Sequence, residues 1–478
     1  MPDIRILASA ALAAALTACV SVPPEPHAVA MPAPPPAELP GDIRAAGAAA
    51  WPADPWWARY GDPQLDALVA RALASSPTLR AAAARVDAAG QALLVAHAAA
   101  GAEAGVVAGA KRQRYSANGL FPSPIGGASV NDFSAQIQAR YDFDLWSRHR
   151  SQVTAAAGEE FARRAEAAQV RQALAGAVAG SYFELQGLWA LAAGLREQAE
   201  AQQRLIDDEE RRVAHGLASA DEPRAQAARL AALRERIAEA EAGALGRREA
   251  LRALLGPGDD LPAALRPRPL PAAQATLPPR LGYELLARRP DLQAARWQVE
   301  SAMSRVEAAR AAFYPEIDLS AALGLDALTL PRLFRTASRT FLIGPALALP
   351  LFSTGTLKGQ LGQARDVRDE RIADYDQRVL DAVRDVAQAA AALQGLAAQA
   401  RQQQQAISLA ESQQRSAEAR RRQGLAGSAS TVQATLAVLR ERQAALQLDR
   451  QRLQAEVALT QALGGGYQAE PSSQPSRN

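Results

Sequence analysis

Few residues in this sequence are of types that could perform chemistry. It holds one cysteine, Cys19, and four histidines, His27, His97, His149 and His215. No two histidines stand at a spacing typical of metal ligands, and a single cysteine cannot form a disulfide within the chain. The motifs GxxxxGK[ST], HExxH, GxSxG and CxxC do not occur. The sequence therefore predicts that the protein is not an enzyme and binds no metal or cofactor.

The chemistry that Cys19 indicates is acylation of its thiol. Residues 1–18 contain an apolar stretch from Ile6 to Leu16, which suits a secretory signal better than a membrane span of ~20 apolar residues. Leu16-Thr17-Ala18-Cys19 is similar to the bacterial lipobox, in which the sulfur takes a diacylglycerol and the new N-terminus is acylated. Several acyl chains would give a stable membrane anchor. An ordinary signal peptide with an incidental cysteine is the alternative.

The residues that follow Cys19 are rich in proline and alanine. The stretch "VPPEPHAVAMPAPPPAELP" predicts an extended tether, and we place this tether at residues 19–55. Val20 stands directly after the cysteine, and by resemblance to other lipoproteins the absence of aspartate there points to the outer membrane. The 53 basic and 50 acidic residues leave a net charge of +3, which argues against a nucleic-acid binder.

The chain repeats itself. "RRVAHGLAS" at 211–219 is similar to "RRRQGLAGS" at 420–428, so that Gly216 matches Gly424 at an offset of 208 residues, and Gly256 matches Gly464 at the same offset. Repetition on this scale indicates two copies of one structural plan. We expect a first copy at 56–265, a Pro-rich linker at 266–279, a second copy at 280–467 and a disordered tail at 468–478.

Each copy is predicted to contain a short helix, two strands, a long helix and another short helix. Gly216 and Gly424 are expected to end the long helices as C-caps, and Asp221 and Ser430 to begin the next helices as N-caps. Each long helix of about 68 residues would extend ~100 Å at 1.5 Å per residue. A long coiled coil with incidental loops is the alternative, which the strands disfavour. The expected elements are 63–99, 102–114, 133–146, 148–215 and 221–255 in the first copy, and 281–312, 316–324, 341–351, 357–423 and 430–463 in the second.

The strand "FSAQIQARYDFDLW" (133–146) alternates between apolar and polar side chains. Four strands per chain are too few for a closed membrane barrel, which needs about eight, and an open sheet with an apolar face would expose its edges. Three copies would supply twelve strands around an aqueous lumen, with the apolar set facing lipid. The candidate lumen residues are Gln136, Gln138, Arg140, Asp142 and Asp318.

These features together resemble one family, the TolC-like outer-membrane efflux proteins, in the lipoprotein (NodT-like) branch that serves RND pumps. The resemblance rests on "WWARYGDPQLDALVARAL" from Trp56, "RRPDLQAAR" at 288–296, "AARAAFYPEIDLSAALG" at 308–324 and "GPALALPLFSTG" at 344–355. It implies a mainly α protein with membrane β-strands. It also implies a homotrimer in which a 12-stranded β-barrel with four strands per protomer would continue into a long α-helical barrel.

The resemblance also implies a function and partners. The protein would be the outer-membrane channel of a tripartite RND-type efflux system, a passive conduit that exports small molecules such as drugs or toxic compounds. Its partners would be a periplasmic adaptor (membrane fusion) protein, an inner-membrane RND pump and outer-membrane lipid. It would be lipid-anchored in and span the outer membrane, with its helical tunnel in the periplasm. A type I secretion conduit and a periplasmic adaptor lipoprotein are the alternatives.

A passive conduit needs a gate, and the turns at Gly216 and Gly424 are where helices can converge. Asp221, Arg224 and Arg421 lie beside these turns, and we expect Asp and Arg contacts between neighbouring helices to hold the tips closed. Solvated charges with little energetic effect are the alternative. Relatives often carry an acidic residue after the second turn. Gln433 stands near that place here, which makes a carboxylate ring at the pore entrance doubtful.

Overall fold

The structure is a computed structural model that describes residues 22–25, 29, 50–256, 260–274, 278, 282–350 and 353–469. The predicted signal peptide, Cys19 and most of the predicted tail lie outside these ranges. The chain divides into two compact units. Unit 1 contains 85–163, 295–375 and the described residues before 33, and unit 2 contains the rest. Each unit draws on both predicted copies of the repeat.

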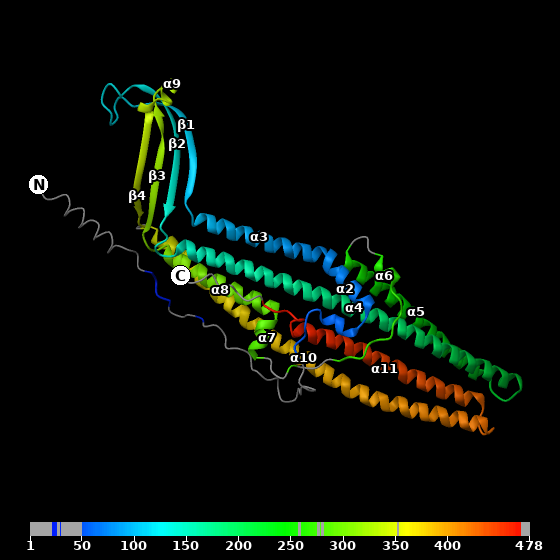
Figure 1. Ribbon diagram of the computed structural model, residues 1–478. Helices are drawn as coiled ribbons and strands as arrows, with labels where there is room; N and C mark the ends of the chain where they lie inside the picture. Colours follow the sequence, from blue (N-terminus) through cyan, green and yellow to red (C-terminus); the bar gives the residue numbers. More distant parts are fainter. Residues whose placement is uncertain are drawn as a thin grey trace. The chain divides into compact units, whose positions relative to one another are not determined.

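Unit 1 contains a four-stranded antiparallel sheet in the order β1-β2-β3-β4 (Figure 1). Its register places Ile137 of β2 opposite Val106 and Leu323, and Leu323 opposite Phe341. Because facing residues share one side of a sheet, these four apolar side chains form a line across it. The strands are β1 (Glu103–Arg114), β2 (Ser129–Asp142), β3 (Glu316–Ala327) and β4 (Arg339–Ala348).

β2 ends at Asp142, although its alternating pattern predicts a strand as far as residue 146. Asp144 leaves the extended conformation with a φ of 42°. Its carboxylate accepts hydrogen bonds from the backbone N–H groups of His149 and Arg150, each at 2.9 Å. These N–H groups belong to the unpaired first turn of α4 (Arg148–Ala214). Asp144, the last polar residue of the pattern, therefore caps a helix instead of extending the strand.

Two of the predicted helices are each divided by a proline. The segment predicted at 63–99 forms α2 (Pro63–Ser75) and α3 (Pro77–Ala99), and the segment at 281–312 forms α7 (Gly282–Arg288) and α8 (Pro290–Ala311). Pro77 and Pro290 each begin the second helix of their pair. Proline lacks an N–H donor and disfavours helical conformation in the residue before it, so the chain bends there.

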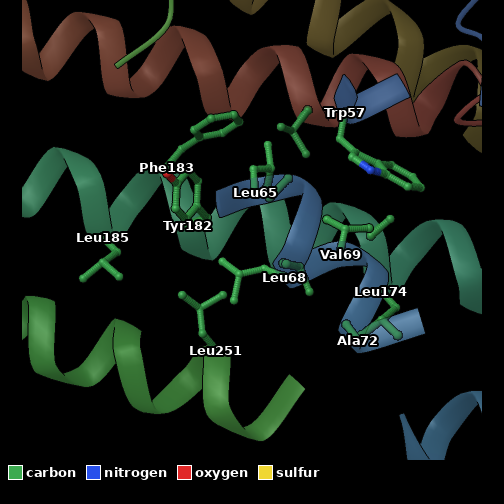
Figure 2. Packing of buried hydrophobic residues seen from close by; sticks show 14 of the residues in the cluster. Trp57, Leu65, Leu68, Val69, Ala72, Leu174, Tyr182, Phe183, Leu185 and Leu251 are labelled. Carbon is green, nitrogen blue, oxygen red and sulfur yellow. The ribbon is translucent and has the colours of Figure 1, made fainter. Parts of the chain in front are cut away.

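The core of unit 2 surrounds α2 (Figure 2). Leu65, Leu68 and Val69 of α2 are fully buried against α4, which contributes Tyr182 and Phe183. Asp62 caps α2 by accepting the N–H of Gln64 at 3.0 Å, and it also accepts the hydroxyl of Tyr182 at 2.6 Å. The same carboxylate thus begins the helix and fixes it to α4.

In the part of the chain that the structure describes, the elements not yet introduced are three long helices and four short elements. The long helices α4 and α10 (Thr354–Arg422) are followed by α5 (Asp221–Leu255) and α11 (Ser428–Ala462). In the described ranges, no helix carries a stretch long and apolar enough to cross a membrane. The short elements are η1 (Trp56–Tyr60), α6 (Leu261–Ala264), α9 (Leu330–Leu333) and η2 (Thr336–Ser338).

The two copies each have a glycine with a positive φ at equivalent positions. Gly256 ends α5 and Gly464 follows α11, with φ values of 95° and 91° that side chains rarely adopt. A β-carbon on Gly256 would lie 3.3 Å from the carbonyl oxygen of Ser75, and one on Gly464 would lie 1.9 Å from that of Arg288. Both glycines therefore pack a helix end against the bend before Pro77 or Pro290.

This difference in clearance predicts different costs for the same substitution. Gly464→Ala should destabilise the protein by about 2–5 kcal/mol, because left-handed backbone strain adds to a clash with the main chain. Gly256→Ala should cost about 1–2 kcal/mol, because the backbone strain is similar but the new β-carbon would make only a tight contact with the carbonyl oxygen of Ser75. Thermal unfolding of the two detergent-extracted variants measures this, and equal melting temperatures would contradict the packing described for Gly464.

Candidate functional site

The turns at the ends of the long helices share one geometry. Gly216 and Gly424 both have a φ of 72°. The N–H of Leu217 donates to the carbonyl oxygen of Arg212, and that of Leu425 donates to Arg420, each at 2.8 Å. This is the Schellman pattern of a helix C-terminus, and it confirms the two predicted glycine caps. Figure 1 shows both turns at the same end of unit 2.

The predicted N-caps of the following helices are wrong. α5 begins at Asp221 itself, whose N–H donates to the hydroxyl of Ser219 at 3.3 Å. α11 begins at Ser428 after Gly427, so Ser430 lies within its first turn and its hydroxyl donates to the carbonyl of Gly427. The N-cap positions are Ala220 and Gly427, one and three residues before the predicted ones, and neither residue has a side chain that caps the helix.

The charged candidates at the tips are exposed. Asp221 pairs with Arg224 one turn along the same helix at 3.2 Å, and both side chains are more than three-quarters exposed. Arg421 and Gln433 are also exposed. Contacts of these residues with neighbouring helices therefore remain a prediction for the assembled protein.

A residue that the sequence did not single out links the two hairpins near their tips. The side chain of Ser428, the first residue of α11, stabilises the carboxylate of Asp208 of α4. Asp208 also pairs with Arg211 at 3.2 Å. The next residue, Glu209, is buried and pairs with Arg212 at 3.0 Å. The run "DDEERR" predicts the two ion pairs within α4, because acids and arginines three residues apart meet on one helix face, but it does not predict the contact with Ser428.

Buried amides make further contacts along the hairpins. Gln198 of α4 donates to Gln443 of α11 at 2.8 Å, and Gln202 of α4 donates to Gln226 of α5 at 2.9 Å. Gln198 and Gln202 are almost completely buried, so the loss of either partner would leave an unsatisfied polar group. These pairs fix how α4 is aligned against both neighbours.

The five lumen candidates share one face of the sheet in unit 1. Gln136, Gln138, Arg140 and Asp142 alternate along β2, and Asp318 of β3 lies opposite Asp142. Arg140 pairs with Asp318 at 2.9 Å, and Gln138 donates to Gln136 at 3.3 Å. Asp142 also contacts His149 at 2.9 Å. The polar face is therefore organised by hydrogen bonds and ion pairs across and along the strands.

The opposite face of the sheet is apolar and uncovered. The line across it consists of Val106, Ile137, Leu323 and Phe341, whose exposed fractions are 75%, 57%, 63% and 83%. A contiguous apolar patch of this kind marks a surface that binds lipid or protein. The two faces together make a wall with an apolar side and a polar side.

Among the described residues, no group of three or more His, Cys, Asp or Glu side chains could hold a metal ion.

Comparison with known proteins identifies relatives of the whole chain. The family model "Outer membrane efflux protein" matches residues 68–257 and 281–465. The multidrug resistance outer membrane protein MdtP of Shigella flexneri is 38% identical over 444 residues, covering 91% of this chain and 90% of that protein. The outer membrane protein VceC of Vibrio cholerae has a crystal structure that matches with a TM-score of 0.79 at 31% identity, covering 87% of this chain and all of that chain.

The contact between Asp208 and Ser428 leads to a prediction for the tips. Asp208→Ala should loosen the start of α11, seen as faster amide hydrogen exchange in peptides that cover 424–436. Glu210→Ala, an exposed neighbour on α4, is the matched control and should leave this exchange unchanged.

The pH dependence of that contact follows from the same bonds. The Ser428 hydroxyl and then Arg211 stabilise the charged carboxylate and hold the pKa of Asp208 below its ordinary value of 3.8. Since the folded pKa is lowered, the stabilisation is present above the ordinary value and is lost as pH falls through the folded one. After correction for the chemical exchange rate, the protection of residues 424–436 in the unaltered protein should therefore not change between pH 7 and pH 5. Acceleration in that range, in excess of the chemical exchange rate, would contradict the assignment.

Proposed function

This chain belongs to the outer membrane efflux protein family, and from that membership we propose that three copies assemble into the outer-membrane conduit of a tripartite efflux system. The family is one of efflux channels and not of enzymes. The observation that carries the proposal is the sheet with one exposed apolar face and one polar face. A surface of this kind is stable where lipid covers the first face and water the second.

The edges of the sheet support the assembly of several copies. β1 and β4 stand at the two ends of the strand order, and each pairs with one neighbour within the chain. Backbone groups of an edge strand have no water to bind within a bilayer, so each edge needs a strand from another copy. Three copies give a closed barrel of twelve strands, with Gln136, Gln138, Arg140, Asp142 and Asp318 facing an aqueous lumen.

The proposed partners are the other two components of a tripartite efflux system. The exposed turns at Gly216 and Gly424 would receive a periplasmic adaptor, below which an inner-membrane RND pump supplies the substrates. Because MdtP is named a multidrug resistance protein, we propose drugs and toxic compounds as the exported class. Acylation of Cys19, which lies outside the described residues, would anchor each copy to the membrane. The four-stranded sheet and the family match favour a channel over a periplasmic adaptor lipoprotein.

Two measurements test the assembly as a whole. Native mass spectrometry of the detergent-extracted protein should show a trimer in which each chain carries acyl groups. Deletion of the gene should raise drug sensitivity in the native cell, and the full-length chain should restore resistance. A stable monomer that stays folded without detergent would contradict the conduit.

Two neighbouring residues of β2 distinguish the proposed lipid face from the lumen face. Ile137→Arg should cost about 2–4 kcal/mol per chain, because it places a guanidinium in the hydrocarbon region. The amount of trimer in the outer membrane should fall sharply, as measured by gel electrophoresis without heating. Gln136→Arg is the matched control: it carries the same new charge on the other face and should assemble normally. Equal loss of trimer in both variants would contradict the assignment of faces.

The proposed latch at the tips is tested by conductance. In planar bilayers, purified trimers of Asp221→Ala and Arg421→Ala should conduct more than the unaltered protein, because contacts that hold the helices together would be removed. Adaptor binding would shift the same equilibrium between closed and open packing. If both variants remain as poorly conducting as the unaltered trimer, the latch does not involve these charges.

A further inference from the structure

A short piece of the N-terminal segment is held against a helix of unit 1. Arg365 of α10 donates to the carbonyl oxygen of Pro23 at 2.9 Å and to that of Pro24 at 3.3 Å. Backbone carbonyls that follow one another in an extended segment face different directions, and one forked guanidinium reaches both. Arg365 therefore fixes the course of the main chain at these two residues.

The next residue of the segment is held by charge. The carboxylate of Glu25 forms an ion pair with Arg368, one turn after Arg365, and lies 3.7 Å from Arg365. The side chains of all three residues are between 11% and 17% exposed, so these charges are shielded from solvent. The hydrogen bond from Arg368 lowers the pKa of Glu25, which keeps the carboxylate charged at neutral pH.

The first described residue of the segment is held by apolar packing. Val22 packs against a buried cluster of unit 1 that contains Val306, Phe313, Leu357 and Leu361. Phe313 stands shortly before β3, which begins at Glu316, and Leu357 lies in the first turn of α10. Val22 is thus seated beside the start of the third strand.

These contacts form a specific binding site. Four consecutive residues supply an apolar side chain, two carbonyl oxygens and a carboxylate. The apolar side chain contacts a buried cluster, the carbonyls share Arg365, and the carboxylate pairs with Arg368. Surface ion pairs alone stabilise little, but a shielded charge pair combined with directional hydrogen bonds holds a segment in one register.

The position of the segment limits where Cys19 can lie. Only three peptide links separate Cys19 from Val22, and an extended chain spans at most ~3.6 Å per residue. By chain length alone, an acyl group on Cys19 would therefore be attached within about 11 Å of Val22.

We propose that Arg365 and Arg368 form a docking site for residues 22–25 that fixes the level at which the acylated N-terminus enters the membrane. This role rests on the proposed function, because it requires acylation of Cys19. The docked segment keeps the acyl chains beside the start of β3, at one end of the strands that span the membrane. The anchor and the sheet then enter the bilayer as one unit.

Photo-cross-linking of the full-length acylated protein in outer membranes tests the docking. Pro24 is exposed, so a p-benzoylphenylalanine at this position keeps the carbonyl that Arg365 binds. Irradiation should join residue 24 to peptides of α10 between 354 and 375, as identified by mass spectrometry. In Arg365→Gln/Arg368→Gln the yield of this product should fall at least tenfold. Arg371→Gln, which removes a partly exposed arginine of the same helix, is the matched control and should not lower it.

A charge exchange separates docking from general loss of folding. Glu25→Arg should lower the yield, and Glu25→Arg with Arg368→Glu should recover at least half of it. Trimers with an unchanged yield in Arg365→Gln/Arg368→Gln, or with cross-links only outside α10, would overturn the docking site. Intact mass measured on the same samples reports acylation: a chain that is cross-linked to α10 but carries no acyl group would overturn the anchoring role and leave the docking contact in place.

Discussion

The four-stranded sheet imposes the constraint from which the rest of the structure follows. Val106, Ile137, Leu323 and Phe341 form an apolar line that the chain itself leaves uncovered, and exposing such surface to water is unfavourable in proportion to its area. The two edge strands carry backbone donors and acceptors that must also be paired. In the proposed conduit, lipid would satisfy the first requirement and further copies of the chain would satisfy the second. The lipid environment and the assembly that we propose therefore both follow from the way the four strands are paired.

The long helices pack through alanine-rich surfaces, which by themselves do not define one alignment of neighbouring helices. Small side chains permit close approach but distinguish poorly between registers. Buried amides at Gln198 and Gln202 remove this ambiguity, because each has a partner in only one alignment. The contact of Asp208 with Ser428 does the same near the tips. Hairpins held by a few exchangeable polar contacts can have two stable packings, which a gate requires.

The sequence predicted those features that depend on local chemistry. The positive φ values at Gly216 and Gly424 follow from the need for glycine after a helix, and the line of strand residues follows from alternation. The end of β2 was missed because Asp144 continues the polar pattern while its carboxylate caps α4. Asp208 was missed because its partner is more than 200 residues away in the chain. Tertiary contacts between helices of similar composition leave no periodic signal.

The two copies of the repeat show which part of a duplicated plan is free to diverge. Gly256 and Gly464 both keep a positive φ, and each approaches the residues just before a helix-starting proline in its own copy. The side chains at that bend differ: Ser76 precedes the proline of the first copy, whereas Arg289 precedes that of the second. Arg289 is buried, binds Asp291 at 2.7 Å and donates to the carbonyl of Ala462 at the end of α11. Because left-handed backbone tolerates little besides glycine, the turn restricts the sequence of both copies equally. The side-chain contacts around this glycine can then differ between the copies. In the second copy, Gly464 lies closer to the main chain of the bend, and Arg289 is buried there.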